Sequence, residues 1–233
     1  MADRRLVLWD IDGTLIDSKG IGAEVFDVAI ERALGVRPPA RVQMAGKTDP
    51  QIVNEYLAML EIEEVEGPGH LPVILEHLVS ALSAVEQVIA ERGRVLPGVE
   101  AVLERLGNDP TVLQTVLTGN VAANAMVKLA AFGLQDRLDL EIGAYGSDHA
   151  DRNRLVPVAL DRAADQRGRR FGQDEVWVVG DAPNDLACAR AGGVRCLLVA
   201  SGRASYDELA ALSPDALLPD LTDTDAVVWL LRS

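Results

Sequence analysis

The chain has 233 residues, of which 48% are hydrophobic and 25% are charged, a composition typical of a folded globular protein rather than a disordered chain. Its formal net charge of -14 disfavours binding to nucleic acid or to an anionic membrane, so neither is an expected partner. Because the chain is so acidic, a site for an anionic substrate needs local positive charge, which a divalent cation held by carboxylates would supply.

The first apolar run, Leu6-Val7-Leu8-Trp9, predicts a strand over residues 6–10 that ends at Asp10. This run is far shorter than a signal-peptide core or the roughly 20 residues of a membrane span. We therefore expect a cytoplasmic protein.

The segment after the first strand carries helical periodicity over roughly 80 residues and contains no convincing strand. Part of it forms a single apolar stripe, made of Ile74, Leu78, Leu82, Val85 and Ile89. Because a structureless loop of this length is uncommon, the segment predicts a small all-helical cap domain at residues 18–94, inserted after strand 1. Residues 1–17 and 95–233 would then form the core domain.

Four further apolar runs predict strands over residues 112–118, 140–144, 176–180 and 196–200. Helical patterns separate these runs, since apolar residues recur at i, i+3, i+4 and i+7 within residues 99–106 and 156–163. Strands and helices that alternate in this way predict an α/β core with a doubly wound, Rossmann-like parallel sheet.

The cysteines and tryptophans are expected in the core. Cys188 and Cys196 have no CxxC partner, so small reduced core residues are favoured over a disulfide or a metal site. Trp9, Trp177 and Trp229 are also interpreted as core residues.

Carboxylates follow two of the predicted strands. Asp10 closes the first strand and Asp12 comes two residues later, while Asp181 and Asp185 follow the strand that ends at Gly180. In open α/β sheets the ligand site lies beyond the carboxyl ends of the strands, so we expect these carboxylates to meet at one edge of the sheet. Carboxylate oxygens are hard ligands that suit Mg²⁺.

A polar group also ends the second predicted strand of the core. Thr118 is followed by Gly119, Asn120 and then a helix. A hydroxyl beside the free N–H groups of a helix N-terminus suits an oxyanion. We therefore expect an anion to bind at this strand end.

Together these motifs resemble the haloacid dehalogenase-like (HAD) superfamily, and specifically its phosphoglycolate phosphatase-like branch with a helical cap. The resemblance runs from about residue 5 to residue 200, and its pieces occur in the order of the family. The matching pieces are Asp10-Ile11-Asp12-Gly13-Thr14-Leu15, Thr118 at a strand end, a basic residue before a helix near Arg154, and Gly180-Asp181-Ala182-Pro183-Asn184-Asp185.

The resemblance implies a Mg²⁺-dependent phosphatase that acts on a small phosphorylated metabolite. Asp10 would attack phosphorus and form an aspartyl-phosphate, and Asp12 would serve as general acid and base. The implied metal site uses Asp10, the backbone carbonyl of Asp12 and Asp181, with Asp185 best suited to orient Asp181 or a metal-bound water. The implied phosphate-binding groups come from Thr118, Gly119 and Asn120.

One position departs from the family pattern. The family usually places a lysine before the helix that precedes the last motif, whereas this chain has Asp151-Arg152-Asn153-Arg154-Leu155. Arg154 is the best equivalent and Arg152 the second. An arginine keeps the positive charge but not the geometry of an ammonium, so activity or substrate pose could differ.

The predicted cap carries a segment, Ala45-Gly46-Lys47-Thr48-Asp49-Pro50, where related caps lower a loop over the active site. Lys47 or Asp49 could therefore contact the leaving group of the substrate. Closure of a cap excludes water and selects substrate size, which favours small metabolites over phosphoproteins.

Several functional alternatives stay open. Asp12 argues against a dehalogenase, because that branch lacks the second carboxylate of the first motif. A phosphomutase of a sugar phosphate, similar to β-phosphoglucomutase, would use the same two carboxylates, and a HAD-fold binding protein could have lost turnover altogether. The sequence leaves both a monomer and a homodimer possible.

Overall fold

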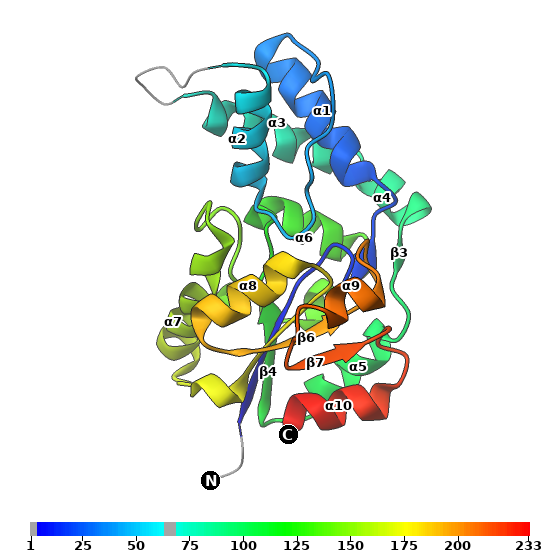
Figure 1. The fold of residues 1–233 in the computed structure, drawn as a ribbon, viewed down its shortest axis with the longest axis vertical. Helices are drawn as coiled ribbons and strands as arrows, with labels where there is room; N and C mark the ends of the chain where they lie inside the picture. Colours follow the sequence, from blue (N-terminus) through cyan, green and yellow to red (C-terminus); the bar gives the residue numbers. More distant parts are fainter. Residues whose placement is uncertain (1–3, 63–68) are drawn as a thin grey trace.

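A five-stranded parallel sheet forms the centre of the structure, a computed structural model that describes residues 4–62 and 69–233. The strand order is β4-β1-β5-β6-β7 (Figure 1). The strands are β1 (Arg5–Trp9), β4 (Val112–Val116), β5 (Val176–Gly180), β6 (Arg195–Val199) and β7 (Ala216–Leu218). The predicted α/β class with a doubly wound parallel sheet is confirmed.

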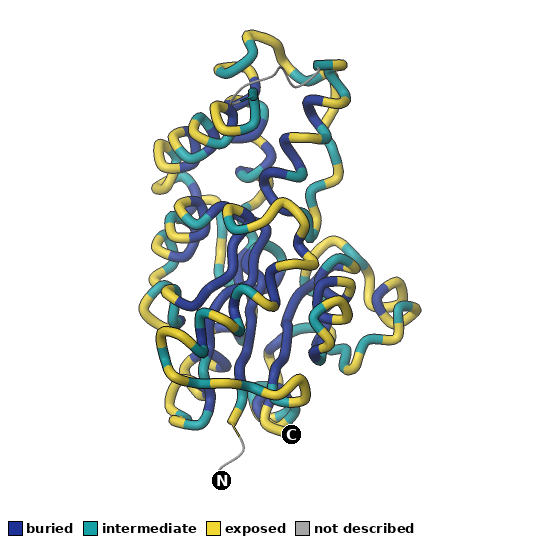
Figure 2. Tube along the Cα trace, turned by 90° about the vertical axis from the view of Figure 1, so that its left-hand side faces the viewer, coloured by how far each residue is buried: buried dark blue, intermediate teal, exposed yellow. Residues whose placement is uncertain are grey.

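Helices cover both faces of this sheet. One face packs on α5 (Val99–Gly107), α6 (Ala122–Ala130) and α10 (Thr224–Arg232). The other packs on α7 (Leu155–Arg167), α8 (Pro183–Gly192) and α9 (Tyr206–Ala210). Because both faces are covered, the strands are apolar almost without interruption, and Figure 2 shows the resulting band of buried residues through the middle of the molecule.

The strand predicted over residues 140–144 is wrong. Leu140–Ile142 forms a short 3-10 helix, η2, and only Ala144 reaches the sheet, where its N–H donates to the carbonyl of Val116 at 2.9 Å. A five-residue apolar run is too short for periodicity to separate a strand from a helical turn. The edge strand β7, in contrast, is missing from the prediction because its three half-buried residues carry little pattern.

The cysteines and two of the tryptophans lie where predicted. Cys188 and Cys196 are buried free thiols, and Trp9 and Trp177 are buried. Trp229 contradicts the prediction, since 72% of it is exposed. It lies on α10, whose buried stripe is Val227, Val228 and Leu231, so the helical period of 3.6 residues turns position 229 toward solvent.

In the described part of the chain, four helices lie between residues 17 and 94 and form what we call the helical insert, residues 21–92. They are α1 (Ile21–Leu34), α2 (Asp49–Met59), α3 (His70–Ser83) and α4 (Glu86–Arg92). They share a hydrophobic cluster of their own, which includes Phe26 and Tyr56. Figure 1 shows α1, α2 and α3 grouped at the end of the molecule away from both termini.

The chain passes between the sheet and the helical insert twice, and the two connecting segments pair with each other. Strand β2 (Ile16–Asp17) leaves the sheet region and β3 (Arg94–Val95) returns to it, and they form an antiparallel ladder. The apolar stripe predicted for this region divides between α3 and α4, with Ile74, Leu78, Leu82 and Ile89 buried and Val85 only partly buried.

Within residues 4–62 and 69–233, no single helix is long and apolar enough to cross a membrane. The pair α3 and α4 meets the length and composition criteria only jointly, and the two helices are bent by 58°.

Candidate active site

A cavity of about 370 Å³ lies at the carboxyl ends of β1, β4 and β5, between the sheet and the helical insert. Residues from both regions line it, including Gly22 and Phe26 of α1. The predicted site residues that line it are Asp10, Asp12, Lys47, Thr118, Gly119, Asn120 and Asp181. Seven predicted positions scattered over some 170 residues are thus brought to one cavity.

Strand register explains the convergence. Trp9 pairs with Val116 on one side and with Val179 on the other. The residues that follow these three positions therefore leave the sheet at one level. Asp10 follows directly, and Thr118 and Asp181 come two residues after Val116 and Val179.

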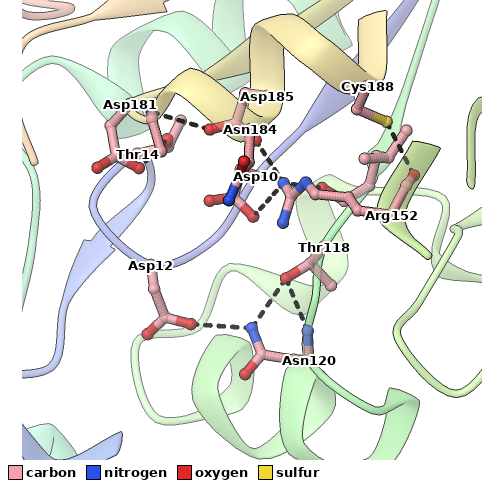
Figure 3. Close-up of polar contacts among 12 residues, drawn as sticks. Asp10, Asp12, Thr14, Thr118, Asn120, Arg152, Asp181, Asn184, Asp185 and Cys188 are labelled. Carbon is pink, nitrogen blue, oxygen red and sulfur yellow. Dashed lines mark hydrogen bonds and ion pairs between the residues drawn. The ribbon is translucent and has the colours of Figure 1, made fainter. Parts of the chain in front are cut away.

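A buried acidic cluster lies on one side of this cavity (Figure 3). Asp10, Asp181 and Asp185 each offer a carboxylate oxygen, and these three atoms lie within 4.8 Å of one another. Burial, followed by repulsion from Asp185 and Asp10, raises the pKa of Asp181 to about 8. Burial also raises the pKa of Asp10 to about 7, even though the charge of Arg152 acts in the opposite direction.

These observations fit a divalent cation. Buried carboxylates at such short range repel one another unless protons or a cation neutralise them. Their oxygens are the hard ligands that Mg²⁺ prefers. Within the described residues the backbone carbonyl of Asp12 accepts no hydrogen bond, so it is free to join Asp10 and Asp181 as a ligand.

Asp185 differs from the other predicted metal-binding residues because both of its carboxylate oxygens already accept hydrogen bonds from the protein. One of its oxygens accepts a short hydrogen bond from Arg152, and the other accepts from the N–H of Ala182 at 2.9 Å. Asp185 also lies outside the cavity lining. It therefore holds Arg152 and caps the start of α8, which is a supporting position behind Asp10 and Asp181.

Glycines allow the chain to pass close to Asp181. A Cβ atom on Gly13 would lie 2.5 Å from Oδ2 of Asp181, and one on Gly202 would lie 1.6 Å from the same oxygen. Gly13 has a φ of 88°, which side chains rarely tolerate. Thr14 donates from Oγ1 to Oδ1 of Asp181 at 3.3 Å, so the loop after β1 helps to orient the carboxylate that follows β5.

Of the two arginines that the sequence offers before α7, the structure places the second choice, Arg152, in the site and leaves the first choice, Arg154, outside it. Arg152 is buried, and its Nη2 donates to Oδ1 of Asp10 at 3.0 Å and to Asp185. Burial acts to lower the pKa of Arg152, but the charges of Asp185 and Asp10 outweigh it and raise the pKa, so the guanidinium stays charged.

Local geometry explains why Arg154 is excluded. Both arginines belong to a 3-10 turn, η3 (Arg152–Arg154), in which successive side chains point about 120° apart. The side chain of Asp151 caps this turn by accepting from the N–H of Asn153 at 3.0 Å. With the turn fixed in this way, Arg152 points into the site, whereas Arg154 is exposed and lies outside the cavity lining.

A polar network lies on the other side of the cavity, around Asp12 (Figure 3). Nδ2 of Asn120 donates to Oδ2 of Asp12 at 2.8 Å and to the hydroxyl of Thr118 at 2.8 Å. Among the described residues, Oδ1 of Asp12 accepts no hydrogen bond, so this oxygen is available to a substrate.

Sequence reasoning missed Lys128, which belongs to this network. Its Nζ lies 2.6 Å from Oδ2 of Asp12 and 2.7 Å from Oδ1 of Asn120, and the residue is buried in the cavity lining. A signal was present in the sequence. Asn120, Asn124 and Lys128 are spaced at i, i+4 and i+8, and the last two fall on the helix face that also carries the buried Ala125 and Leu129.

Lys47 and Asp49 both line the cavity, but their charged groups have protein partners. Nζ of Lys47 pairs with Glu55 at 2.6 Å. Asp49 is buried, and its Oδ2 accepts from the N–H of Val121 at 2.8 Å, at the start of α6. Burial raises the pKa of Asp49 to about 6, although the charge of Lys128 acts to lower it.

The loop before α2 docks onto the sheet side of the cavity at two further points. Oγ1 of Thr48 donates to the carbonyl of Ala150 at 2.5 Å. A Cβ atom on Gly119 would lie only 1.9 Å from the carbonyl oxygen of Lys47, so only a glycine allows this approach. The helical insert thus lies closed over the strand ends.

Comparison with known proteins shows which family the sequence matches. The sequence matches the family model of haloacid dehalogenase-like hydrolases over residues 7–190, a stretch that contains Asp10, Asp12, Thr118 and Asp181. A solved structure of a predicted phosphoglycolate phosphatase from Haemophilus somnus 129pt superposes with a TM-score of 0.71 at 19% identity. The superposition covers 98% of this chain and 99% of that chain. At 19% identity, the likeness shows that the two proteins share a fold and nothing about function.

Two curated relatives resemble the chain over most of its length. The phosphoglycolate phosphatase of Pseudomonas fluorescens (strain Pf0-1) is 28% identical over 231 residues, which cover 93% of this chain and 77% of that protein. A plasmid phosphoglycolate phosphatase of Cupriavidus necator is 27% identical over 232 residues, which cover 97% and 94% of the two chains.

Proposed function

This chain belongs to the haloacid dehalogenase-like hydrolase family, and we propose that it is a Mg²⁺-dependent phosphatase of a small phosphate monoester. The observation that carries this proposal is the convergence of Asp10, Asp12, Asp181 and Arg152 on one small cavity. The reaction would proceed through an aspartyl-phosphate on Asp10.

Asp10 is the proposed nucleophile. One of its oxygens attacks phosphorus in line with the ester bond, the bond from phosphorus to the ester oxygen breaks, and the phosphoryl group stays on the carboxylate. Arg152 fixes the orientation of this carboxylate through the 3.0 Å contact to Oδ1 and supplies a permanent positive charge next to the phosphoryl oxygens. Thr118 and the N–H of Gly119 would bind another phosphoryl oxygen, since the next three N–H groups already donate to Thr118, Asp49 and Ser147.

Asp12 is the proposed acid and base. Its Oδ2 is held by Asn120 and Lys128, which leaves Oδ1 directed to the substrate. Asp12 would give its proton to the leaving oxygen and then accept a proton from the water that hydrolyses the aspartyl-phosphate. The order of the two proton transfers explains why a single carboxylate can serve both halves of the reaction.

Asp10, Asp181 and the backbone carbonyl of Asp12 would hold Mg²⁺, with Asp185 behind them. When bound, Mg²⁺ supplies positive charge that offsets repulsion between the carboxylates and the phosphate. The acidic cluster and the raised pKa values of Asp10 and Asp181 support such a site.

Residues 18–94 would act as a cap that opens for substrate entry and closes for the reaction. The contacts of Thr48 and Asp49 across the cavity support this role, since they hold the insert onto the strand ends. A closed cap of this size excludes water and large substrates, which favours small metabolites. The names of the curated relatives make phosphoglycolate a reasonable first substrate to test.

The test is a screen of small phosphate monoesters with and without Mg²⁺, for wild type and for Asp10→Asn. We expect phosphate release that requires Mg²⁺ and disappears in Asp10→Asn. If wild type releases phosphate from none of them, or if Asp10→Asn is as active as wild type, the proposed mechanism is wrong. Isomerisation of a sugar phosphate with little phosphate release would instead indicate a phosphomutase.

A further inference from the structure

Lys128 lines the cavity and contacts Asp12 and Asn120. Its side chain is only 7% exposed, and it reaches the cavity from α6, whereas Arg152 reaches it from the turn η3. A lysine is rarely buried unless its ammonium has partners or a ligand. Asp12 and Asn120 are such partners, so the observation that points to a ligand is the donor capacity that these two contacts leave unused.

The ammonium has donor capacity left over. It carries three N–H donors, of which one is directed to Asp12 and one to Asn120. In the described parts of the chain no third acceptor lies within hydrogen-bond distance of Nζ. A Cβ atom on Gly22, across the cavity on α1, would be 4.0 Å from Nζ, so the absence of a side chain there leaves room in front of the ammonium.

The two buried cations of the cavity serve different sides of it. Arg152 contacts Asp10 and so belongs to the side of the phosphoryl group. Lys128 contacts Asp12, whose task is to protonate the leaving oxygen, and so belongs to the side of the leaving group. A substrate bound between Asp10 and Asp12 would therefore turn its organic part toward Lys128.

We propose that Lys128 is a specificity-determining residue that binds a carboxylate carried by the leaving group close to the ester oxygen. This inference rests on the proposed function, because that function assigns the Asp12 side of the cavity to the leaving group. The carboxylate of the substrate must lie close to the ester oxygen, because Nζ of Lys128 lies only 2.6 Å from Asp12, the residue proposed to protonate that oxygen. A carboxylate is also a small anion, as a cavity of about 370 Å³ that already holds a phosphoryl group requires.

Three two-carbon phosphate monoesters test the proposal directly. Phosphoglycolate, ethyl phosphate and phosphoethanolamine have leaving groups of similar size that end in a carboxylate, a methyl group and an ammonium. With wild type and Mg²⁺, we expect kcat/KM to fall in that order, with about a 10- to 100-fold preference for phosphoglycolate over ethyl phosphate, as one charge-assisted hydrogen bond provides.

Lys128→Met should lower kcat on all three esters, because Lys128 also holds Oδ2 of Asp12, and should in addition raise KM for phosphoglycolate, so that the preference over ethyl phosphate is lost. Lys128→Arg should restore part of the preference. Lys128→Gln provides a second neutral variant if Lys128→Met does not fold, and circular dichroism checks folding. Lys19→Met is the matched control, because it removes one lysine charge from a half-exposed side chain outside the cavity lining.

The outcomes separate this inference from the proposed function. Equal kcat/KM for the three esters in wild type, or an equal loss on all three in Lys128→Met, overturns it, since the lysine would then only position Asp12. Calorimetric titration of Asp10→Asn with phosphoglycolate and ethyl phosphate provides an arm that needs no turnover. If no ester is hydrolysed but the carboxylate is still preferred in binding and Lys128→Met abolishes this preference, the proposed function fails and the carboxylate site stands. The absence of a binding preference overturns the site.

Discussion

Nη2 of Arg152 lies 3.0 Å from Oδ1 of Asp10, so a guanidinium that cannot lose its charge touches the proposed nucleophile. The same Nη2 atom also donates to Asp185, and all three side chains are buried. This arrangement puts a rigid, planar cation in the segment where the sequence resemblance predicts a basic residue. Its removal would leave two buried carboxylates without a counter-charge.

We therefore predict that Arg152→Met destabilises the protein by about 3–5 kcal/mol, the cost typical of breaking a buried ion pair. Phosphatase activity should fall to background, and Arg152→Lys should recover part of it. Urea unfolding and initial rates measure the two effects. Arg154→Met is the matched control and should change stability by no more than about 0.5 kcal/mol, because Arg154 is exposed. The opposite ranking of the two arginines would contradict the site described above.

Asp12→Asn should lower kcat on an alkyl phosphate by about 10²- to 10⁴-fold, the usual contribution of a general acid and base. An asparagine has no proton to give to the leaving oxygen and cannot activate water. With p-nitrophenyl phosphate, whose leaving group needs no protonation, the first step should survive and the second should not. Stopped-flow measurement should then show a burst of about one nitrophenolate per enzyme, followed by slow turnover. A variant that turns over p-nitrophenyl phosphate at the wild-type steady rate would rule out Asp12 as the base.

Metal-free protein should lose stability as the pH rises from 6 to about 8. The pKa values of Asp10 and Asp181 are raised in the folded state to about 7 and about 8, above the ordinary value of 3.8. The folded state therefore binds more protons than the unfolded state between pH 3.8 and about 8, so its stability falls with rising pH over this window and levels off once both groups have ionised in the folded state. Thermal unfolding in EDTA across this pH range measures the effect.

Mg²⁺ should reverse this loss at high pH, because it neutralises the ionised carboxylates. At 100 times its Kd, the cation adds about 2.7 kcal/mol, or roughly 5–10 °C in Tm for a chain of this length. At pH 6 the gain should be smaller, since protons compete for the same oxygens. Asp181→Asn should abolish most of the gain, and an unchanged response in this variant would exclude Asp181 as a ligand.

Asp49→Ala should loosen the helical insert. Helix α6 has no side-chain cap of its own, and the carboxylate of Asp49 supplies one from the insert by accepting from the N–H of Val121. Loss of such a cap costs about 0.5–2 kcal/mol. Hydrogen exchange should become faster at the start of α6 and in the loop before α2, but not in β5.

Asp49→Asn tests whether the acceptor or the charge matters, since it keeps an oxygen in the same place. We expect it to preserve slow exchange better than Asp49→Ala. Unchanged exchange in Asp49→Ala would mean that the contacts of Thr48 with Ala150 hold the insert without Asp49.

Local sequence patterns predicted most of the elements but failed at short ones. The stripe of Val99, Val102, Leu103 and Leu106 is buried on α5 as expected, because a repeat of 3.6 residues directly reports a helix face. The run over residues 140–144 and the exposed Trp229 show where a prediction from hydrophobic character fails. Hydrophobic character alone does not say whether a side chain faces the core or whether a short run reaches the ladder.

By itself, the sequence determined that Asp10, Asp12, Thr118 and Asp181 lie at one edge of a parallel sheet, because each follows a strand and parallel strands end on the same side. Only the tertiary structure decided that Arg152 rather than Arg154 contacts Asp10, and that Lys128 contacts Asp12. The first choice depends on how a 3-10 turn directs its side chains, and the second on a helix that packs 116 positions away from Asp12. Local periodicity puts Lys128 on the buried face of its helix but does not give its partner, and it does not separate Arg152 from Arg154.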